Sequence, residues 1–129
     1  MSEITDVMST DVVTVDLKTP IAEAIKLLLK HNITGVPVVD KKMRLLGIVS
    51  EKDLLKLIYK LKSKSYNSGH RFGTVESVMT KDVISFDEND CLIDVCKCLM
   101  ERNFRRVPVL SKGKIVGIIS RKDILTYNH

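Results

Sequence analysis

The sequence contains the same ordered set of motifs twice. A Val-Met-Ser/Thr-x-Asp-Val block, a Val-Pro-Val block and a Gly-Ile-Val/Ile-Ser-x-x-Asp block recur with offsets of 71, 71 and 70 residues. The paired positions are 7–16 with 78–87, 36–39 with 107–110, and 47–53 with 117–123. Each copy alone is too short to bury a large core, so the two copies are expected to pack together. The repeat predicts two pseudo-equivalent surfaces and two pseudo-equivalent sites.

The residue pattern of each copy indicates a strand, a helix, two strands and a second helix. In the first copy a β-branched run at 12–15 predicts a strand. Apolar residues with helical spacing at 19–30 predict a helix that begins at Thr19. Apolar runs at 36–39 and 45–50 predict a hairpin, and Ser50 begins the second helix. The second copy repeats this order, with Asp90 and Ser120 in the two capping positions.

Composition is that of an ordinary globular protein, with 44% hydrophobic and 29% charged residues. No apolar run approaches the ~20 residues that span a bilayer, and the acidic N-terminus is unlike a secretory signal. Three cysteines, an odd number, favour a reducing compartment, so we expect a cytoplasmic protein without a membrane segment.

The net charge of +5 is concentrated in one segment. Residues 59–75 carry Lys60, Lys62, Lys64 and Arg71 and no acidic residue. The sequence favours a solvated basic linker here, and we do not expect nucleic acid as a partner. A polyanion-binding arm stays open as the alternative.

The Gly-x-x-Ser-x-x-Asp block carries the clearest chemistry. A strand that passes through glycine into a Ser-capped helix leaves backbone N–H groups free for a phosphate, and the glycine would let a ligand approach the backbone. The Asp could accept hydrogen bonds from a ribose diol. The alternative is a structural capping box, because Ser-x-x-Asp before an apolar run is also a common helix start.

Taken together, the three motifs resemble a tandem pair of cystathionine β-synthase (CBS) domains, also called a Bateman module. The resemblance covers nearly the whole chain. It implies an α/β (α+β) fold of two β-α-β-β-α repeats that pack with pseudo-two-fold symmetry and a cleft on either side. We place the repeats at 5–61 and 76–128, with the basic linker at 62–75.

In that family the clefts commonly hold AMP, ADP, ATP, S-adenosylmethionine or NADH. The resemblance implies that Asp53 and Asp123 bind ribose hydroxyls and that Ser50 and Ser120 contact phosphate. The residues that would enclose the adenine are Val13, Thr14, Val36 and Pro37 in the first copy, and Ile84, Ser85, Val107 and Pro108 in the second.

The two copies differ chemically just before the Val-Pro-Val strand. Thr34 and Gly35 precede it in the first copy, whereas Arg105 and Arg106 precede it in the second. A guanidinium group binds phosphate through charge-assisted, bidentate hydrogen bonds. We therefore expect the second site to prefer a phosphorylated nucleotide, with a solvated strand edge as the alternative interpretation of the arginines.

No residue pattern indicates catalysis or a metal site. The cysteines at 91, 96 and 98 have no usual zinc spacing, and two of them replace aliphatic residues of the first copy, which favours small buried hydrophobes. We expect a stand-alone regulatory module that is not an enzyme, requires no cofactor, forms a homodimer and transmits nucleotide occupancy to an unidentified effector protein. The alternative is a protein-protein or nucleic-acid interaction module with vestigial clefts.

Overall fold

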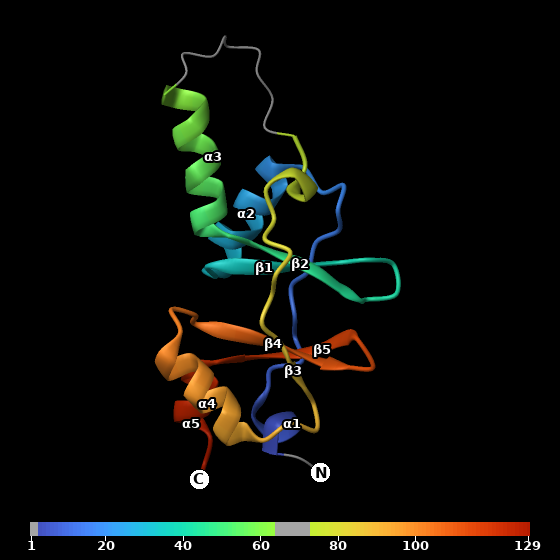
Figure 1. The fold of residues 1–129 in the computed structure, drawn as a ribbon, viewed down its shortest axis with the longest axis vertical. Coiled ribbons are helices and arrows are strands. Elements are labelled where there is room, and N and C mark those ends of the chain that lie inside the picture. The colour runs from blue at the N-terminus through green and yellow to red at the C-terminus, as the bar shows by residue number, and fades with distance from the viewer. Residues whose placement is uncertain (1–2, 64–72) are drawn as a thin grey trace. The chain divides into compact units, whose positions relative to one another are not determined.

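The computed structural model describes residues 3–63 and 73–129, and these form two compact units (Figure 1). The first, called here the N-unit, is Val13–Val83. The second, called here the C-unit, joins Met1–Val12 to Ile84–His129. The units do not coincide with the sequence repeats, because the opening residues of each copy belong to the unit that holds the rest of the other copy. The repeat boundaries at 5–61 and 76–128 stay predictions about the sequence.

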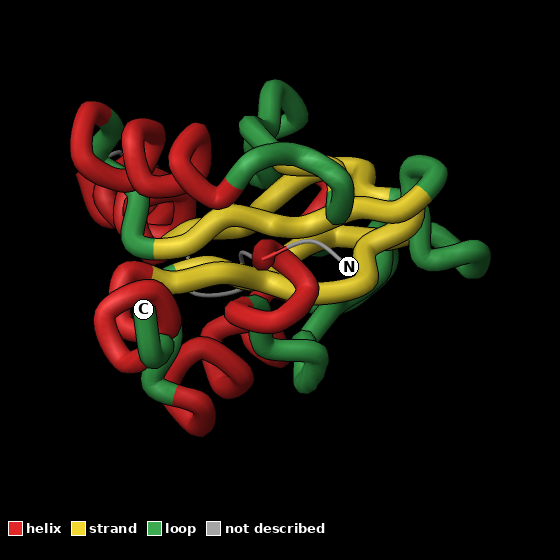
Figure 2. The backbone as a smooth tube through the Cα atoms, turned by 90° about the horizontal axis from the view of Figure 1, so that it is seen from below, coloured by secondary structure: helices red, strands yellow, loops and turns green. Residues whose placement is uncertain are grey.

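The N-unit is a two-stranded antiparallel hairpin with helices packed on one face (Figure 2). Four consecutive residues of β1 are buried, whereas β2 alternates between buried and partly buried residues, as a strand with one core-facing side does. Its elements in chain order are α2 (Ile21–His31), β1 (Gly35–Val39), β2 (Leu45–Ser50), α3 (Glu51–Ser63) and the 3₁₀-helix η1 (Val75–Ser77).

The C-unit repeats this architecture and adds one short strand. The strand order is β3-β4-β5, with β3 parallel to β4 and β4 antiparallel to β5. Its elements in chain order are α1 (Glu3–Val7), β3 (Phe86–Asp87), α4 (Leu92–Glu101), β4 (Arg106–Ser111), β5 (Lys114–Ser120) and α5 (Arg121–Thr126). Both hairpins carry a register shift at equivalent positions, after Val38 and after Val109, so the repeat extends to details of the strand pairing.

The opening segments are exchanged between the copies, and the colours of Figure 1 show this directly. The blue helix α1 lies among the orange and red elements of the C-unit, and Ser9 exchanges two backbone hydrogen bonds with Ile118 of β5, at 2.8 and 2.9 Å. In the N-unit, Thr80 makes the same pair of bonds with Ile48 of β2, at 2.8 and 2.9 Å. Each hairpin therefore pairs with residues from the start of the other copy.

Each exchanged segment also places an apolar side chain in the core of its unit. Ile4 of α1 is 0% exposed and packs with Val95, Val107 and Ile119 of the C-unit. Its repeat equivalent, Val75, is likewise 0% exposed in the N-unit core. Full burial of one such side chain stabilises a fold by about 1.5–3 kcal/mol, so each core depends on the opening of the other copy.

Three local expectations were wrong. The strand at 12–15 is reduced to one bridge, Val15 with Val38. Thr19 and Asp90 do not cap the helices that follow them; Thr19 Oγ1 instead accepts from the backbone N–H of Asp16 at 3.1 Å, and Asp90 closes the equivalent turn. Each of these two side chains accepts a hydrogen bond from the turn before the helix and not from the first turn of the helix, so each helix begins one residue later than expected.

Other expectations hold or fall outside the described residues. The apolar faces of α2 and α4 are buried or partly buried except at their last position, where Leu29 and Met100 are 76% and 78% exposed. Lys64 and Arg71 of the predicted linker lie among residues 64–72, outside the described part. Within the described residues, no helix has the length and hydrophobicity needed to cross a membrane.

Candidate functional site

The Ser-Asp pair of the N-unit begins helix α3. The Ser50 backbone N–H donates to Asp53 Oδ2 at 2.9 Å, and the Asp53 N–H donates to Ser50 Oγ at 3.2 Å. The Ser50 hydroxyl also donates to Asp53 Oδ2, at 3.0 Å. The capping interpretation of this motif is therefore confirmed, and it uses mainly one of the two carboxylate oxygens.

The Ser-Asp pair of the C-unit forms the same capping box at the start of α5. The Ser120 N–H donates to Asp123 Oδ2 at 2.8 Å, and the Asp123 N–H donates to Ser120 Oγ at 3.1 Å. Among the described residues, no donor is found on Asp123 Oδ1, and the Ser120 hydroxyl makes no bond to the carboxylate. This capping arrangement leaves one oxygen of the carboxylate and one hydroxyl proton available to a ligand.

The glycines of this motif serve packing within the protein, which corrects the expectation that they give a ligand access to the backbone. A Cβ at Gly47 would lie 2.8 Å from the Thr80 carbonyl oxygen and 3.0 Å from Met79 Sδ. A Cβ at Gly117 would collide with Met8 and lie 3.1 Å from the carbonyl oxygen of Ser9. The exchanged opening segment needs this close approach, so the glycine is required by the fold itself.

The arginines of the second copy lie beside the C-unit pair. Arg106 is the cross-strand partner of Ser120, and the Arg105 carbonyl accepts from the Arg121 N–H at 3.1 Å. The Nε atom of Arg106 is buried and has no hydrogen-bond partner among the residues that the structure describes. A buried unpartnered donor of a charged group is costly, so an acceptor bound to this Nε–H would be favourable.

The equivalent place in the N-unit carries no such group. Gly35 is the cross-strand partner of Ser50, and the Thr34 carbonyl accepts from the Glu51 N–H at 2.9 Å. The backbone is thus the same in both units and only the side chains differ. The chemical contrast that the sequence predicted is present at one matched position.

The predicted adenine-enclosing residues fall into two groups. Val13 and Thr14 in the N-unit, and Ile84 and Ser85 in the C-unit, are half-buried and lie just before the residues that pair with the Val-Pro strand. The residues of the Val-Pro strands are buried, and Val36 and Val107 belong to the two cores. The members of this second group are Val36, Pro37, Val107 and Pro108. Contact of either group with an adenine stays a prediction.

One residue near the site was missed by sequence reasoning. Thr80 Oγ1 lies 3.1 Å from Asp53 Oδ1 and 3.4 Å from Asp53 Oδ2, and it donates to this carboxylate. Thr80 belongs to the Val-Met-Ser/Thr block, which recurs in both copies and is therefore a visible signal. Its contact with the closing helix of the first copy depends on the exchange of opening segments, which the sequence does not indicate.

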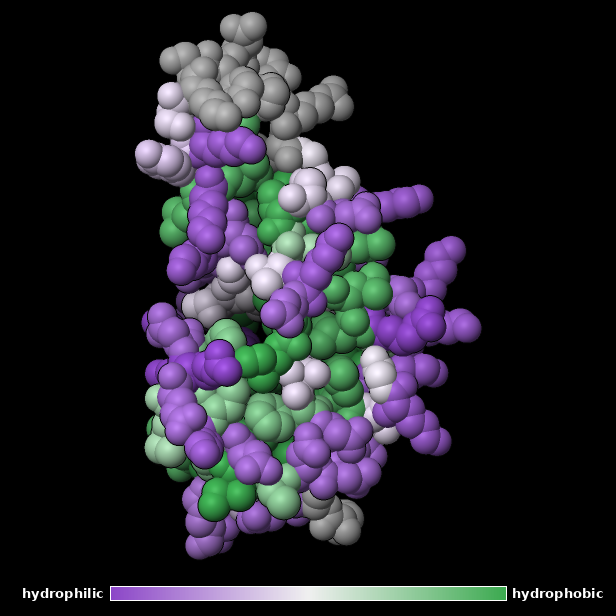
Figure 3. Space-filling view, viewed as in Figure 1, coloured by the Kyte–Doolittle hydropathy of each residue, from purple (hydrophilic) through white to green (hydrophobic). Residues whose placement is uncertain are grey.

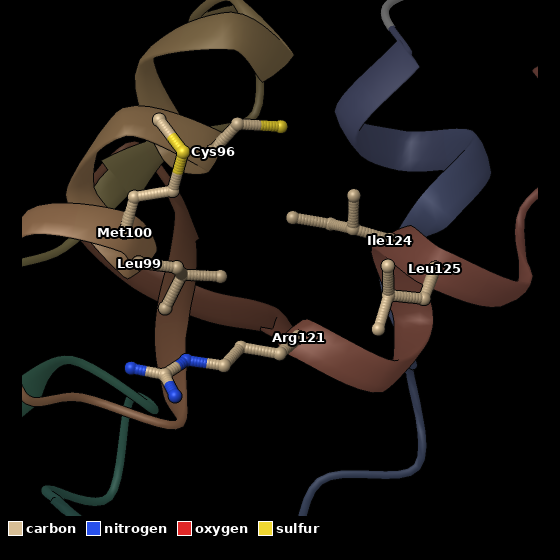
Figure 4. Close-up of a pocket in the computed structure, with 6 residues that line it drawn as sticks. All are labelled: Cys96, Leu99, Met100, Arg121, Ile124 and Leu125. Carbon is tan, nitrogen blue, oxygen red and sulfur yellow. The ribbon is translucent and has the colours of Figure 1, made fainter.

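A hollow of about 480 Å³ lies elsewhere in the C-unit, between α4 and α5 (Figure 4). Apolar side chains of the two helices face each other across it, and Arg121 lies at one end. Its lining residues are Cys96, Leu99, Met100, Arg121, Ile124 and Leu125. Cys96 and Cys98 are partly buried against the C-unit core, as small hydrophobes would be, whereas Cys91 is exposed. The hollow lies on the helix face and does not include the Ser-Asp pair.

The chain belongs to the CBS domain family. The family model, described as CBS domain, matches residues 4–60 and 75–129. Among solved structures, CBSX2 of Arabidopsis thaliana in complex with AMP is 33% identical, with a TM-score of 0.79, over 95% of this chain and 92% of that one. The CBS domain pair of protein MJ0100, in complex with 5′-methylthioadenosine and S-adenosyl-L-methionine, is 31% identical, with a TM-score of 0.77, over 95% and 91% of the two chains.

Longer proteins also contain a similar segment. L-aspartate semialdehyde sulfurtransferase of Methanocaldococcus jannaschii is 32% identical over 92% of this chain, which spans 22% of the enzyme. For the first three curated relatives the chain spans 40%, 71% and 34% of their lengths. The likeness therefore concerns the CBS pair and leaves the activity of the longer proteins aside.

Proposed function

We propose that this CBS pair is a regulatory module that binds an adenosine-containing ligand, with its principal site at Ser120 and Asp123 of the C-unit. Two similar CBS pairs hold AMP, or methylthioadenosine and S-adenosylmethionine. The observation that carries the proposal is the Asp123 carboxylate: one of its oxygens has no donor among the described residues, and the nearby Arg106, the cross-strand partner of Ser120, has a buried Nε atom without a partner there.

The ribose of such a ligand suits the Asp123 carboxylate. An ionised carboxylate accepts about four hydrogen bonds, and the capping box supplies one donor to Asp123. Both hydroxyls of a ribose diol can therefore donate to it without displacing a protein donor. Ile84, Ser85, Val107 and Pro108 would enclose the adenine.

A phosphate group suits the same unit. Arg106 carries a buried Nε–H without an acceptor, and the Ser120 hydroxyl is free to donate. A phosphate oxygen would satisfy both, and the bond to guanidinium would be charge-assisted. AMP, ADP and ATP are thus favoured here over uncharged adenosine derivatives, whereas Thr34 and Gly35 give the N-unit site no cation.

We propose a regulatory rather than a catalytic role. The polar side chains of the Ser-Asp pairs bind one another in capping boxes, an arrangement that positions acceptors and donors for recognition. The nucleotide is then a regulatory ligand, and no further cofactor is required.

Occupancy would be transmitted through the exposed apolar helix faces. Leu29 and Leu55 of the N-unit are 76% and 65% exposed, and their repeat equivalents in the C-unit, Met100 and Leu125, are 78% and 81% exposed. Figure 3 shows hydrophobic residues at the surface over α4, among hydrophilic ones. Matched apolar faces on both units fit self-association into a homodimer or contact with an effector protein.

Thermal unfolding with AMP, ATP, S-adenosylmethionine and NADH tests the proposal. A ligand at about 100 times its dissociation constant stabilises the folded state by about 2.7 kcal/mol, a rise of several degrees in Tm. We expect Asp123→Asn to remove most of this rise for AMP, and Asp53→Asn to remove less. The Tm values of both variants without ligand control for loss of the cap. A Tm that none of the four ligands raises would refute the proposal.

A further inference from the structure

Besides the hydroxyl of the capping serine, which bonds the carboxylate in the N-unit alone among the described residues, the two Ser-Asp sites differ in one contact with the opening segment. In the N-unit, the Thr80 hydroxyl donates to Asp53, with distances of 3.1 Å to Oδ1 and 3.4 Å to Oδ2. Thr80 comes from the opening segment of the second copy, whereas Asp53 comes from the closing helix of the first. The contact therefore joins residues of different copies inside one unit.

Ser9 occupies the equivalent position in the C-unit. Its backbone exchanges two hydrogen bonds with Ile118, as the Thr80 backbone does with Ile48, so the two residues are held in the same place. Among the described residues, however, no hydrogen bond joins the Ser9 hydroxyl to Asp123. The difference lies in the side chain alone.

The donors on each carboxylate determine what a ligand can add. Within residues 3–63 and 73–129, Asp53 accepts from three protein groups: the Ser50 N–H, the Ser50 hydroxyl and the Thr80 hydroxyl. Within the same residues, Asp123 accepts from one, the Ser120 N–H. With about four acceptor positions in each carboxylate, Asp123 can receive both hydroxyls of a ribose diol, whereas Asp53 can receive one.

We infer that Thr80 competes with a ligand at the N-unit site. Its hydroxyl occupies the Asp53 carboxylate that a ribose would bind, and it thereby lowers the affinity of this site for the ligand. This inference rests on the proposed function and adds a specificity-determining residue to it. Both donors from Ser50 fall on Asp53 Oδ2, whereas the shorter contact of the Thr80 hydroxyl is with Oδ1, the oxygen that the cap does not use. Thr80 is therefore the donor that a diol bound across both carboxylate oxygens would displace. The Thr80 side chain is exposed, and its hydroxyl can bind water when displaced.

The affinity difference follows from the displaced bond. One hydrogen bond typically contributes a net free energy of about 1 kcal/mol, which changes a dissociation constant about fivefold. We therefore expect two classes of site for one adenosine nucleotide, the tighter at Asp123 and the weaker at Asp53.

Isothermal titration with AMP tests the role of Thr80 directly. The Asp123→Asn background removes the tighter site, so binding at Asp53 is measured alone. In this background we expect Thr80→Val, which keeps the shape and removes the hydroxyl, to raise AMP affinity about fivefold. Thr80→Ala gives a second variant without the donor. In the matched Asp53→Asn background, Ser9→Ala should leave AMP affinity unchanged.

A ligand without the diol supplies the chemical control. For 2′,3′-dideoxy-AMP, Thr80→Val should give no gain, because no hydroxyl of this ligand needs the Asp53 carboxylate. Equal AMP affinity with and without the Thr80 hydroxyl would overturn the inference while leaving the proposed function intact. Reduced affinity would also overturn it and would make Thr80 a ligand contact. Absence of AMP binding to every variant, the unmodified chain included, would overturn the inference, and a Tm that none of the four ligands raises would overturn the proposed function itself.

Discussion

Ile4 stabilises the second copy of the repeat rather than its own, and truncation of its side chain gives a sharp test. Ile4 is 0% exposed and packs in the C-unit core with Val95, Val107 and Ile119. The change Ile4→Ala removes three carbon atoms from this core and leaves a cavity among residues that lie about 90 positions or more along the chain. We expect the hairpin formed by β4 and β5 to lose stability.

The magnitude follows from the burial of this residue. Ile→Ala changes in protein cores cost 2–5 kcal/mol, and one fully buried isoleucine on a short helix should cost about 3 kcal/mol. The matched variant is Val75→Ala, at the repeat-equivalent and equally buried position of the N-unit. It removes two carbon atoms, so it should cost about 2 kcal/mol, and it should act on β1 and β2.

Native-state amide hydrogen exchange distinguishes the two effects, because it reports the stability of each segment separately. A loss of 3 kcal/mol accelerates exchange about 100-fold where exchange follows unfolding of the unit. We expect this acceleration at Val107 and Ile119 for Ile4→Ala, and a smaller one at Val36 and Val49 for Val75→Ala. If Ile4→Ala instead accelerated amide exchange more in β1 and β2 than in β4 and β5, the conclusion that the opening segments pack in the other copy's core would be refuted.

Three further predictions each concern a single residue. Gly47→Ala should destabilise by about 1–3 kcal/mol and more than Gly117→Ala in urea unfolding, because the first Cβ meets a backbone oxygen and the second mainly a flexible methionine. Hydrogen bonds from the Arg44 backbone N–H and guanidinium lower the pKa of Asp40 in the folded state. The stabilisation that ionised Asp40 provides is therefore present above its unfolded-state pKa and is lost as the pH falls through the lower folded-state pKa. Asp40→Asn should remove this loss of stability in acid, and NMR titration of the Asp40 carboxyl should show the lowered pKa. Leu125→Lys should weaken any self-association seen by sedimentation, because it places charge on an apolar face.

Much of the fold could be predicted because the two copies check each other. Helical spacing, the hairpin runs and the Ser-begun helices recur, and the structure confirms them at α2, β1, β2 and α3 and at their counterparts. The caps at Thr19 and Asp90 were wrong in the same way in both copies, which shows the limit of this check. An error in interpreting one copy is made again in the other, so agreement between the copies does not reveal it.

The exchange of opening segments could not be predicted from local pattern. Ile4 and Val75 have the same apolar character and lie at equivalent positions, so the sequence gives no indication of which core each one enters. Which core each residue enters depends on contacts between residues far apart in the sequence, and such contacts cannot be deduced from local propensity or periodicity. The close approach at Gly47 depends on the same contacts, so the local pattern around this glycine does not indicate its packing role.

The difference between the two sites shows where a repeat gives the most information. Arg106 against Gly35 is a large change of residue type and could be found by aligning the copies. Thr80 against Ser9 is a conservative change between two hydroxyl residues, yet only Thr80 donates to the carboxylate beside it among the described residues. Under the proposed function both differences would act in one direction, because Arg106 would give the Asp123 site a partner for phosphate and Thr80 would occupy the Asp53 carboxylate. Two copies that fold alike would thus respond to different concentrations of one nucleotide, and a single module would cover a wider range than either site alone.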